Sequence, residues 1–245
     1  MVNPKELRSR VKKFFHFSKQ EIIGLVPAIL VTAFIFSFRD WGGDQLSVSV
    51  GLTHLFIMAI ITAITFFFRL SFQKIFALSE GYEAEFKVWW AGLIISLVLI
   101  FVTLGFVPLV LSGTLVVALR VKQRLGEFRY GFSHKDNAII NFIGIAGNML
   151  LAILFAIGNF FIPETFFFTK GLILNLVMGV TLLLPLPQLE GLNIFFGSRT
   201  LYFTAIPLVI LNSLLLLSGT KIGLIISIIL AALAIIFYTL TGSEK

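Results

Sequence analysis

Long runs of apolar residues dominate this chain and restrict what it can fold into. A helix needs about 20 mostly apolar residues to cross the hydrocarbon core of a bilayer. The 245-residue chain is 58% hydrophobic, so a water-soluble fold would leave large apolar patches exposed to solvent. We therefore predict an all-α polytopic membrane protein with about six transmembrane helices, within a single membrane domain at residues 21–245. The expected spans are 22–38, 47–68, 138–162, 171–187, 200–217 and 221–240.

A seventh apolar segment, residues 88–119, is too long for one comfortable span and too short for two. Gly105, Pro108 and Gly113 interrupt it. Irregular backbone is tolerated at membrane depth only where other parts of the protein cover it. We therefore expect a re-entrant hairpin here, accompanied by short strands on the cytoplasmic side.

The basic residues predict the orientation of the chain. The chain has 19 lysines and arginines, and most of them lie in segments that this topology places on one face, such as residues 1–19, 69–87 and 120–137. Cytoplasmic loops of membrane proteins carry an excess of Lys and Arg, so we expect both termini on the cytoplasmic side of the cell membrane. The three that fall on the other face are Arg39, Lys170 and Lys221.

The first 20 residues form a basic, amphipathic cytoplasmic arm. We expect this arm to lie against anionic lipid headgroups, which attract basic segments next to a membrane. It has no base-reading motif beside it, so we expect no nucleic-acid partner. Cysteine is absent, which excludes disulfides and thiolate ligands. A transporter is disfavoured because the polar residues cluster near one face and no paired repeat is evident.

Ionisable residues in an apolar segment are costly, so each one marks a candidate site. Arg69 and Gln73 follow the second predicted span and lie four residues apart, which places them on the same face of a helix. Glu190 follows the fourth span in the stretch LLLPLPQLEGLN. Pro185 and Pro187 must break or end that helix, so the chain turns just before the carboxylate.

Residues 69–86, RLSFQKIFALSEGYEAEF, resemble the HExxH helix and following strand of archaeal integral-membrane zinc metalloproteases of the site-2 protease family. Three further stretches resemble segments of that family in the same order: residues 17–38 its first span, residues 112–117 (SGTLVV) its Pro-Gly-Ala-Val-like segment, and residues 141–155 its Ala-Gly-Pro…Asn helix. A fourth, LLPLPQLEGLNIFFGSR at 183–199, resembles its Leu-Pro-x-Pro-Pro-Leu-Asp-Gly motif, which supplies the third zinc ligand. The resemblance implies a site-2-protease-like fold, in a family whose activity is intramembrane proteolysis.

The chain departs from that family at the residues that carry the chemistry. Arg69 and Gln73 stand where the two zinc-binding histidines belong, and Leu70 stands where the catalytic glutamate belongs. Zinc in an enzyme needs three protein ligands and an open position for water, and Glu190 is the one residual candidate ligand. Without a general base in place of Leu70, hydrolysis lacks its proton acceptor. We therefore predict no catalytic residues, no metal and no other cofactor.

None of the three histidines restores the site. His54 lies fifteen residues before Arg69, at the far end of the same predicted helix. His16 and His134 have no second ligand three or four residues away. A histidine-based zinc site is therefore not expected.

Two interpretations of Arg69, Gln73 and Glu190 remain open. In the first, Arg69 and Gln73 fill the vacated metal site and Arg69 pairs with Glu190, because a guanidinium presents a fork of donors to a carboxylate. In the second, Arg69 extends to the headgroups while Glu190 sits in water at a loop.

The predicted function is that of a catalytically inactive relative, a pseudoprotease, which binds a membrane client or a partner subunit. In the family, a sheet near the position of residues 82–88 (YEAEFKV) holds an extended substrate as an added strand. The alternatives are an active intramembrane zinc metalloprotease with non-standard ligands and a structural subunit of a membrane complex. The candidate client-binding residues are Tyr82, Glu83, Ala84, Glu85, Phe86, Pro185, Pro187 and Gln188.

Overall fold

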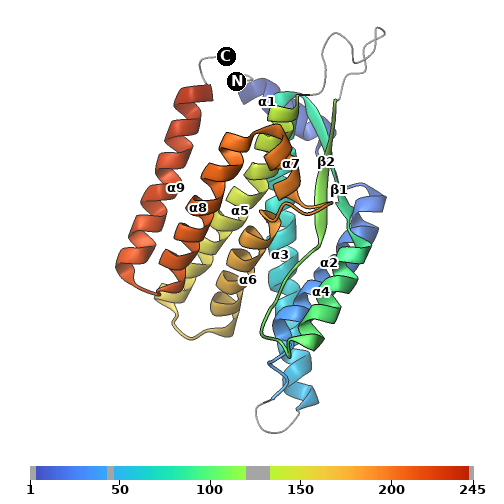
Figure 1. The fold of residues 1–245 in the computed structure, drawn as a ribbon, viewed down its shortest axis with the longest axis vertical. Helices are drawn as coiled ribbons and strands as arrows, with labels where there is room; N and C mark the ends of the chain where they lie inside the picture. Colours follow the sequence, from blue (N-terminus) through green and yellow to red (C-terminus); the bar gives the residue numbers. More distant parts are fainter. Residues whose placement is uncertain (1–3, 43–46, 120–132, 243–245) are drawn as a thin grey trace.

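The computed structural model describes residues 4–42, 47–119 and 133–242, so most of the basic segment predicted at 120–137 lies outside the described residues. Within these ranges the chain folds into a helical bundle with one small sheet (Figure 1). The elements are α1 (Pro4–Phe14), α2 (Lys19–Ser37), α3 (Val48–Glu80), β1 (Tyr82–Val88), α4 (Trp90–Val102), β2 (Gly113–Leu119), α5 (His134–Phe161), α6 (Phe166–Leu182), α7 (Glu190–Gly197), α8 (Arg199–Leu217) and α9 (Lys221–Gly242).

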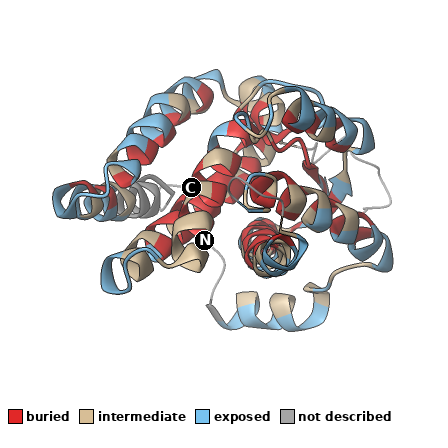
Figure 2. Cartoon of the chain, turned by 90° about the horizontal axis from the view of Figure 1, so that it is seen from below, coloured by how far each residue is buried: buried red, intermediate tan, exposed pale blue. Residues whose placement is uncertain are grey.

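The long helices are apolar enough to be embedded in a membrane. Among the described residues, four helices have the length and composition to cross a bilayer: α2, α3, α5 and α8. Shorter apolar helices are α4, α6 and the described part of α9 up to Leu233. Buried residues line the inner faces of the bundle and exposed residues its outside (Figure 2), where apolar side chains such as Phe56 and Leu214 lie.

Several helix boundaries differ from the predicted spans, most of all the end of α3 and both ends of α6, which runs from Phe166 to Leu182. The span predicted at 47–68 belongs to α3, a single 33-residue helix that continues to Glu80. It ends at Gly81, whose positive φ of 87° is easily adopted by glycine, and the Gly81 N–H bonds the last carbonyls of the helix. The span predicted at 171–187 is α6, which ends at Leu182 before the two prolines. Hydropathy alone could not locate either end. α3 continues past its apolar part into a stretch with polar residues, and apolar residues continue past the end of α6 at 183–187.

The segment 88–119, which we predicted to be a re-entrant hairpin, contains α4, an irregular return stretch and β2. β2 pairs antiparallel with β1, from Tyr82 opposite Leu119 to Val88 opposite Gly113. A Cβ on Gly113 would lie 2.2 Å from the Lys87 carbonyl oxygen, so glycine is required where the strands meet. In Figure 1, α4 lies beside α2, and both lie on the opposite side of the bundle from α8 and α9.

A buried ion pair attaches α2 and β1 to α3. Lys74 Nζ on α3 donates to Glu21 Oε2 at 2.8 Å, and both side chains are almost fully buried. The other oxygen of Glu21 accepts the backbone N–H of Phe86 in β1 at 2.7 Å. Glu21 also completes a capping box with Ser18 at the start of α2. One carboxylate therefore connects three elements that the core also packs together.

Candidate functional site

Arg69, Gln73 and Glu190 meet inside the bundle. Arg69 and Gln73 lie one turn apart on α3, and Glu190 is the first residue of α7. Gln73 Nε2 donates to Glu190 Oε1 at 2.9 Å, and Arg69 Nη1 lies 3.5 Å from the same oxygen. All three side chains are 0% exposed. Arg69 therefore does not extend to the surface of the described chain, and Glu190 does not sit in water.

The chain places Glu190 by a sharp turn between α6 and α7. α6 ends at Leu182, and the exposed loop that contains the two prolines returns the backbone to the bundle. A Cβ on Gly191 would lie 2.2 Å from the Leu183 carbonyl oxygen, so the start of α7 packs directly on the end of α6. A carboxylate in the first turn of a helix is also favoured by the helix dipole.

The contact between Arg69 and Glu190 is not bidentate, although a guanidinium can pair with a carboxylate through two nitrogens. One nitrogen of Arg69 approaches one oxygen of Glu190, and that oxygen is shared with Gln73. The guanidinium also lies over the rings of Phe66 and Phe86, at 5.3 and 6.0 Å from their centroids. The nitrogens of Arg69, Glu190 Oε2 and Gln73 Oε1 have no hydrogen-bond partner among the described residues. The site is thus a buried, incompletely satisfied ion pair.

α5 forms another wall of the site. A Cβ on Gly144 would lie 2.2 Å from Gln73 Nε2, so glycine gives the amide its space. Gln73 Nε2 also lies 3.4 Å from the Asn141 carbonyl oxygen. Asn148, one turn further along α5, is buried with both side-chain polar atoms unpartnered among the described residues.

Several polar residues near this site had no predicted role. Thr114 at the start of β2 contacts the Asn141 side chain at 3.4 Å and accepts a hydrogen bond from Asn193 of α7 at 3.2 Å. The pair between Glu21 and Lys74 was likewise not predicted. The one available signal was the capping-box spacing of Ser18 and Glu21, together with a lysine directly after Gln73.

The candidate client-binding residues fall into two groups. Tyr82, Ala84 and Phe86 point into the protein from β1, whereas Glu83 and Glu85 are exposed on its other face. Burial, reinforced by the hydrogen bond that Tyr82 donates to Asp136 at 3.0 Å, raises the pKa of Tyr82 above its ordinary value. The second group, Pro185, Pro187 and Gln188, is exposed in the loop directly before Glu190.

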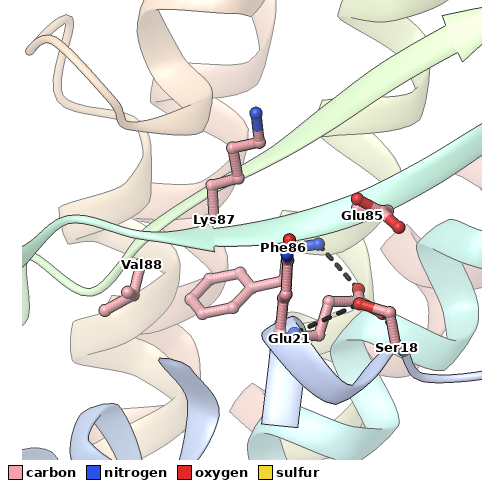
Figure 3. A pocket seen from close by; sticks show the side chains of 7 residues that line it. Ser18, Glu21, Glu85, Phe86, Lys87 and Val88 are labelled. Carbon is pink, nitrogen blue, oxygen red and sulfur yellow. Dashed lines mark hydrogen bonds between the residues drawn. The ribbon is translucent and has the colours of Figure 1, made fainter. Parts of the chain in front are cut away.

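The outer edge of β1 is already used at one position. Trp89 bonds to Ser112 across the sheet, so by alternation the Phe86 backbone points away from β2, where its N–H donates to Glu21 (Figure 3). A hollow of about 250 Å³ adjoins this edge. Its lining residues are Ser18, Gln20, Glu21, Glu85, Phe86, Lys87 and Val88. An added strand would have to displace the Glu21 carboxylate or pair elsewhere.

Comparisons with known proteins point to metalloprotease-like relatives. The chain is 27% identical over 182 residues to a Methanocaldococcus jannaschii protein named "Putative zinc metalloprotease MJ0611", a match that covers 72% of this chain and 84% of that protein. No family model matches the chain, and no solved structure matches it. The similarity supports a distant metalloprotease-like origin.

The residues at the site do not fit the zinc ion that such a relative implies. Glu190 is one carboxylate, its neighbours are an amide and a guanidinium, and a guanidinium repels a metal cation rather than binding it. Within the described ranges, no group of three or more His, Cys, Asp or Glu is arranged to hold a metal ion. His54 lies near the start of α3, far along the helix from Arg69, and its ring stacks on Phe166.

Glu190→Ala should strongly destabilise the protein. The substitution leaves the Arg69 guanidinium buried without a counter-charge, which costs about 3–5 kcal/mol when one partner of a buried pair is removed. Thermal unfolding of the purified protein in detergent measures the loss. The double variant Arg69→Met/Glu190→Leu removes both charges and should unfold close to the parent. If Glu190→Ala unfolds like the parent protein, the pair is not a buried charge contact.

Two glycines of α5 provide a matched test of the site's packing. Gly144→Ala places a methyl group on the Gln73 amide and should displace it from Glu190, lowering the unfolding temperature in detergent. Gly147→Ala places its methyl 3.7 Å from the nearest atoms, an ordinary contact, and should change stability little. Equal effects of the two substitutions would show that helix propensity, and not the contact with Gln73, controls the outcome.

Proposed function

We propose that this chain is a catalytically inactive, site-2-protease-like membrane protein that binds a membrane client or a partner subunit. The proposal includes six spans with a re-entrant segment at 88–119 and both termini on the cytoplasmic side of the cell membrane. One observation carries it: Arg69 and Gln73 both contact Glu190, so a guanidinium and an amide occupy the place where the resemblance puts a metal. A protein cation then balances the carboxylate that a zinc ion would otherwise balance.

The loss of chemistry follows from the same residues. Peptide hydrolysis by zinc needs an ion with an open coordination position and a group that takes a proton from its water. Arg69 supplies positive charge but no coordination position, because a guanidinium has donors and no acceptor. Leu70, at the position of the general base, is fully buried and apolar. Neither requirement is met by the side chains around Glu190.

Two features support a binding role. The loop with Pro185, Pro187 and Gln188 is exposed immediately beside the buried site, where a neighbouring chain can reach it. On β1, an exposed charged row and the adjoining hollow offer polar contacts to an extended segment. Binding at either place requires no reaction at Glu190. Of the possible partners, a membrane protein fits best, because the surrounding helices are themselves apolar on their outer faces.

The first test measures zinc. Detergent-purified protein, freed of chelators, should contain far less than one zinc per chain by elemental analysis, and Glu190→Ala should not change that amount. The triple variant Arg69→His/Leu70→Glu/Gln73→His should gain zinc, because both histidines would flank Glu190; adding Glu190→Ala should reduce it again. Stoichiometric zinc in the parent protein that falls in Glu190→Ala would overturn the proposal and favour an active protease.

The second test addresses binding. A photo-crosslinking amino acid at Gln188 should give discrete, uncleaved protein adducts in native membranes, since this side chain is exposed beside the site. The same amino acid at Ile94, an exposed apolar position on α4, is the control for random encounters in the bilayer. Adducts that form equally at both positions would contradict a specific binding site at the loop. An adduct partner that also co-purifies at a fixed ratio would identify a stable subunit rather than a transient client.

A further inference from the structure

α1 is a short amphipathic helix that lies across the bundle and not along it (Figure 1). Viewed along the bundle, it runs outside the other helices (Figure 2). Its apolar residues Leu7, Val11 and Phe14 are half-buried, at the spacing that forms one stripe on a helix. A helix with this position and pattern is typical of proteins that lie in the interface between lipid and water.

Arg10 fixes α1 against the end of α3. Its guanidinium donates to the carbonyl oxygens of Leu78 and Ser79 at 3.0 and 3.3 Å, and these carbonyls belong to the last turn of α3. The same side chain also bonds Glu6 at 2.6 Å. A cation at a helix C-terminus is stabilised by the free carbonyls and by the helix dipole. The orientation of α1 relative to the bundle is therefore set by specific bonds.

The chain after α1 continues onto the outer surface of α3. Phe15 contacts Phe17, and Phe17 contacts Phe67 with ring centroids 5.3 Å apart. Phe67 is a large apolar side chain that is 43% exposed on a helix long enough to span a bilayer. This aromatic row runs from α1 to a lipid-facing part of α3, which places α1 at the edge of the apolar region.

The opposite face of α1 is basic. Lys5, Arg8 and Lys12 lie on one exposed face at helical spacing, and Lys13 is exposed next to them. The one acidic residue of the helix, Glu6, is bonded to Arg10. These four residues therefore give the outward side of the helix positive charge, while its inward side carries the apolar stripe and Arg10.

We propose that α1 binds the anionic phospholipid surface of the membrane, with Arg8 and Lys12 as headgroup contacts and Arg10 as the residue that orients the helix. Anionic headgroups attract basic residues close to the surface, and the apolar stripe fits the boundary below them. A soluble polyanion would match the charge but has no use for the apolar stripe or the aromatic row that leads to α3. This proposal is independent of whether the protein is enzymatically active.

The test uses the full-length protein in detergent with a single reporter. The chain has no cysteine, so Ser9→Cys provides one thiol on the exposed side of α1 for an environment-sensitive fluorophore. Adding phosphatidylglycerol to the micelles should shift its emission to shorter wavelength, and phosphatidylcholine should not. Arg8→Gln/Lys12→Gln should raise the phosphatidylglycerol concentration needed for this shift about thirtyfold, as expected for the loss of two basic contacts with an anionic surface.

A matched control removes the same charge elsewhere. Arg39→Gln/Lys221→Gln lowers the net charge equally at exposed positions outside α1 and should leave the phosphatidylglycerol response unchanged. All substituted positions are exposed, and unchanged thermal unfolding of each variant verifies that it is folded. A response equal for both lipids, or equally weakened in both variants, would overturn the proposal. A response to soluble heparin but not to phosphatidylglycerol would also overturn it.

Discussion

α3 carries two cations that the fold has removed from solvent, and the rest of the structure depends on how they are neutralised. Arg69 contacts Glu190 of α7, and Lys74 contacts Glu21 of α2. An unpaired charge in such a place would cost several kcal/mol, so each cation requires its carboxylate. The partners come from distant parts of the sequence, so the Lys74 pair requires α2 to pack on α3, and the Arg69 pair requires the start of α7 to reach α3.

The two pairs differ in how completely they are satisfied. Glu21 accepts hydrogen bonds from Lys74, from the Phe86 backbone and from the Ser18 backbone, so both of its oxygens are used. Glu190 leaves one oxygen unpartnered among the described residues, and the nitrogens of Arg69 are likewise unpartnered there. Natural proteins rarely leave buried polar groups unsatisfied, and they do so mainly at functional sites. The first pair is accordingly a structural contact of the fold, whereas the second is the candidate functional site.

Local spacing predicted part of this arrangement and could not predict the remainder. Four-residue spacing placed Arg69 and Gln73 on one face, and the prolines before Glu190 predicted the chain reversal. The ends of α3 and α6 and the pairing of β1 with β2 were not accessible, because hydropathy does not encode strand register or tertiary contacts. The Glu21–Lys74 pair joins residues 53 positions apart. The local sequence around each residue has an ordinary explanation, such as the capping box of Glu21, and does not indicate the contact.

Under the proposed function, the scaffold keeps its shape without a metal because shape and chemistry depend on different residues. The packing of α3, α5, α6 and α7 rests on apolar contacts and on glycines such as Gly144 and Gly191. Zinc chemistry rests on three ligands and a base, which are few and replaceable. The Arg69 guanidinium supplies positive charge next to Glu190 but no coordination position. Distant similarity to a metalloprotease therefore supports a metalloprotease-like family, whereas the presence of activity depends on the residues at 69, 70, 73 and 190.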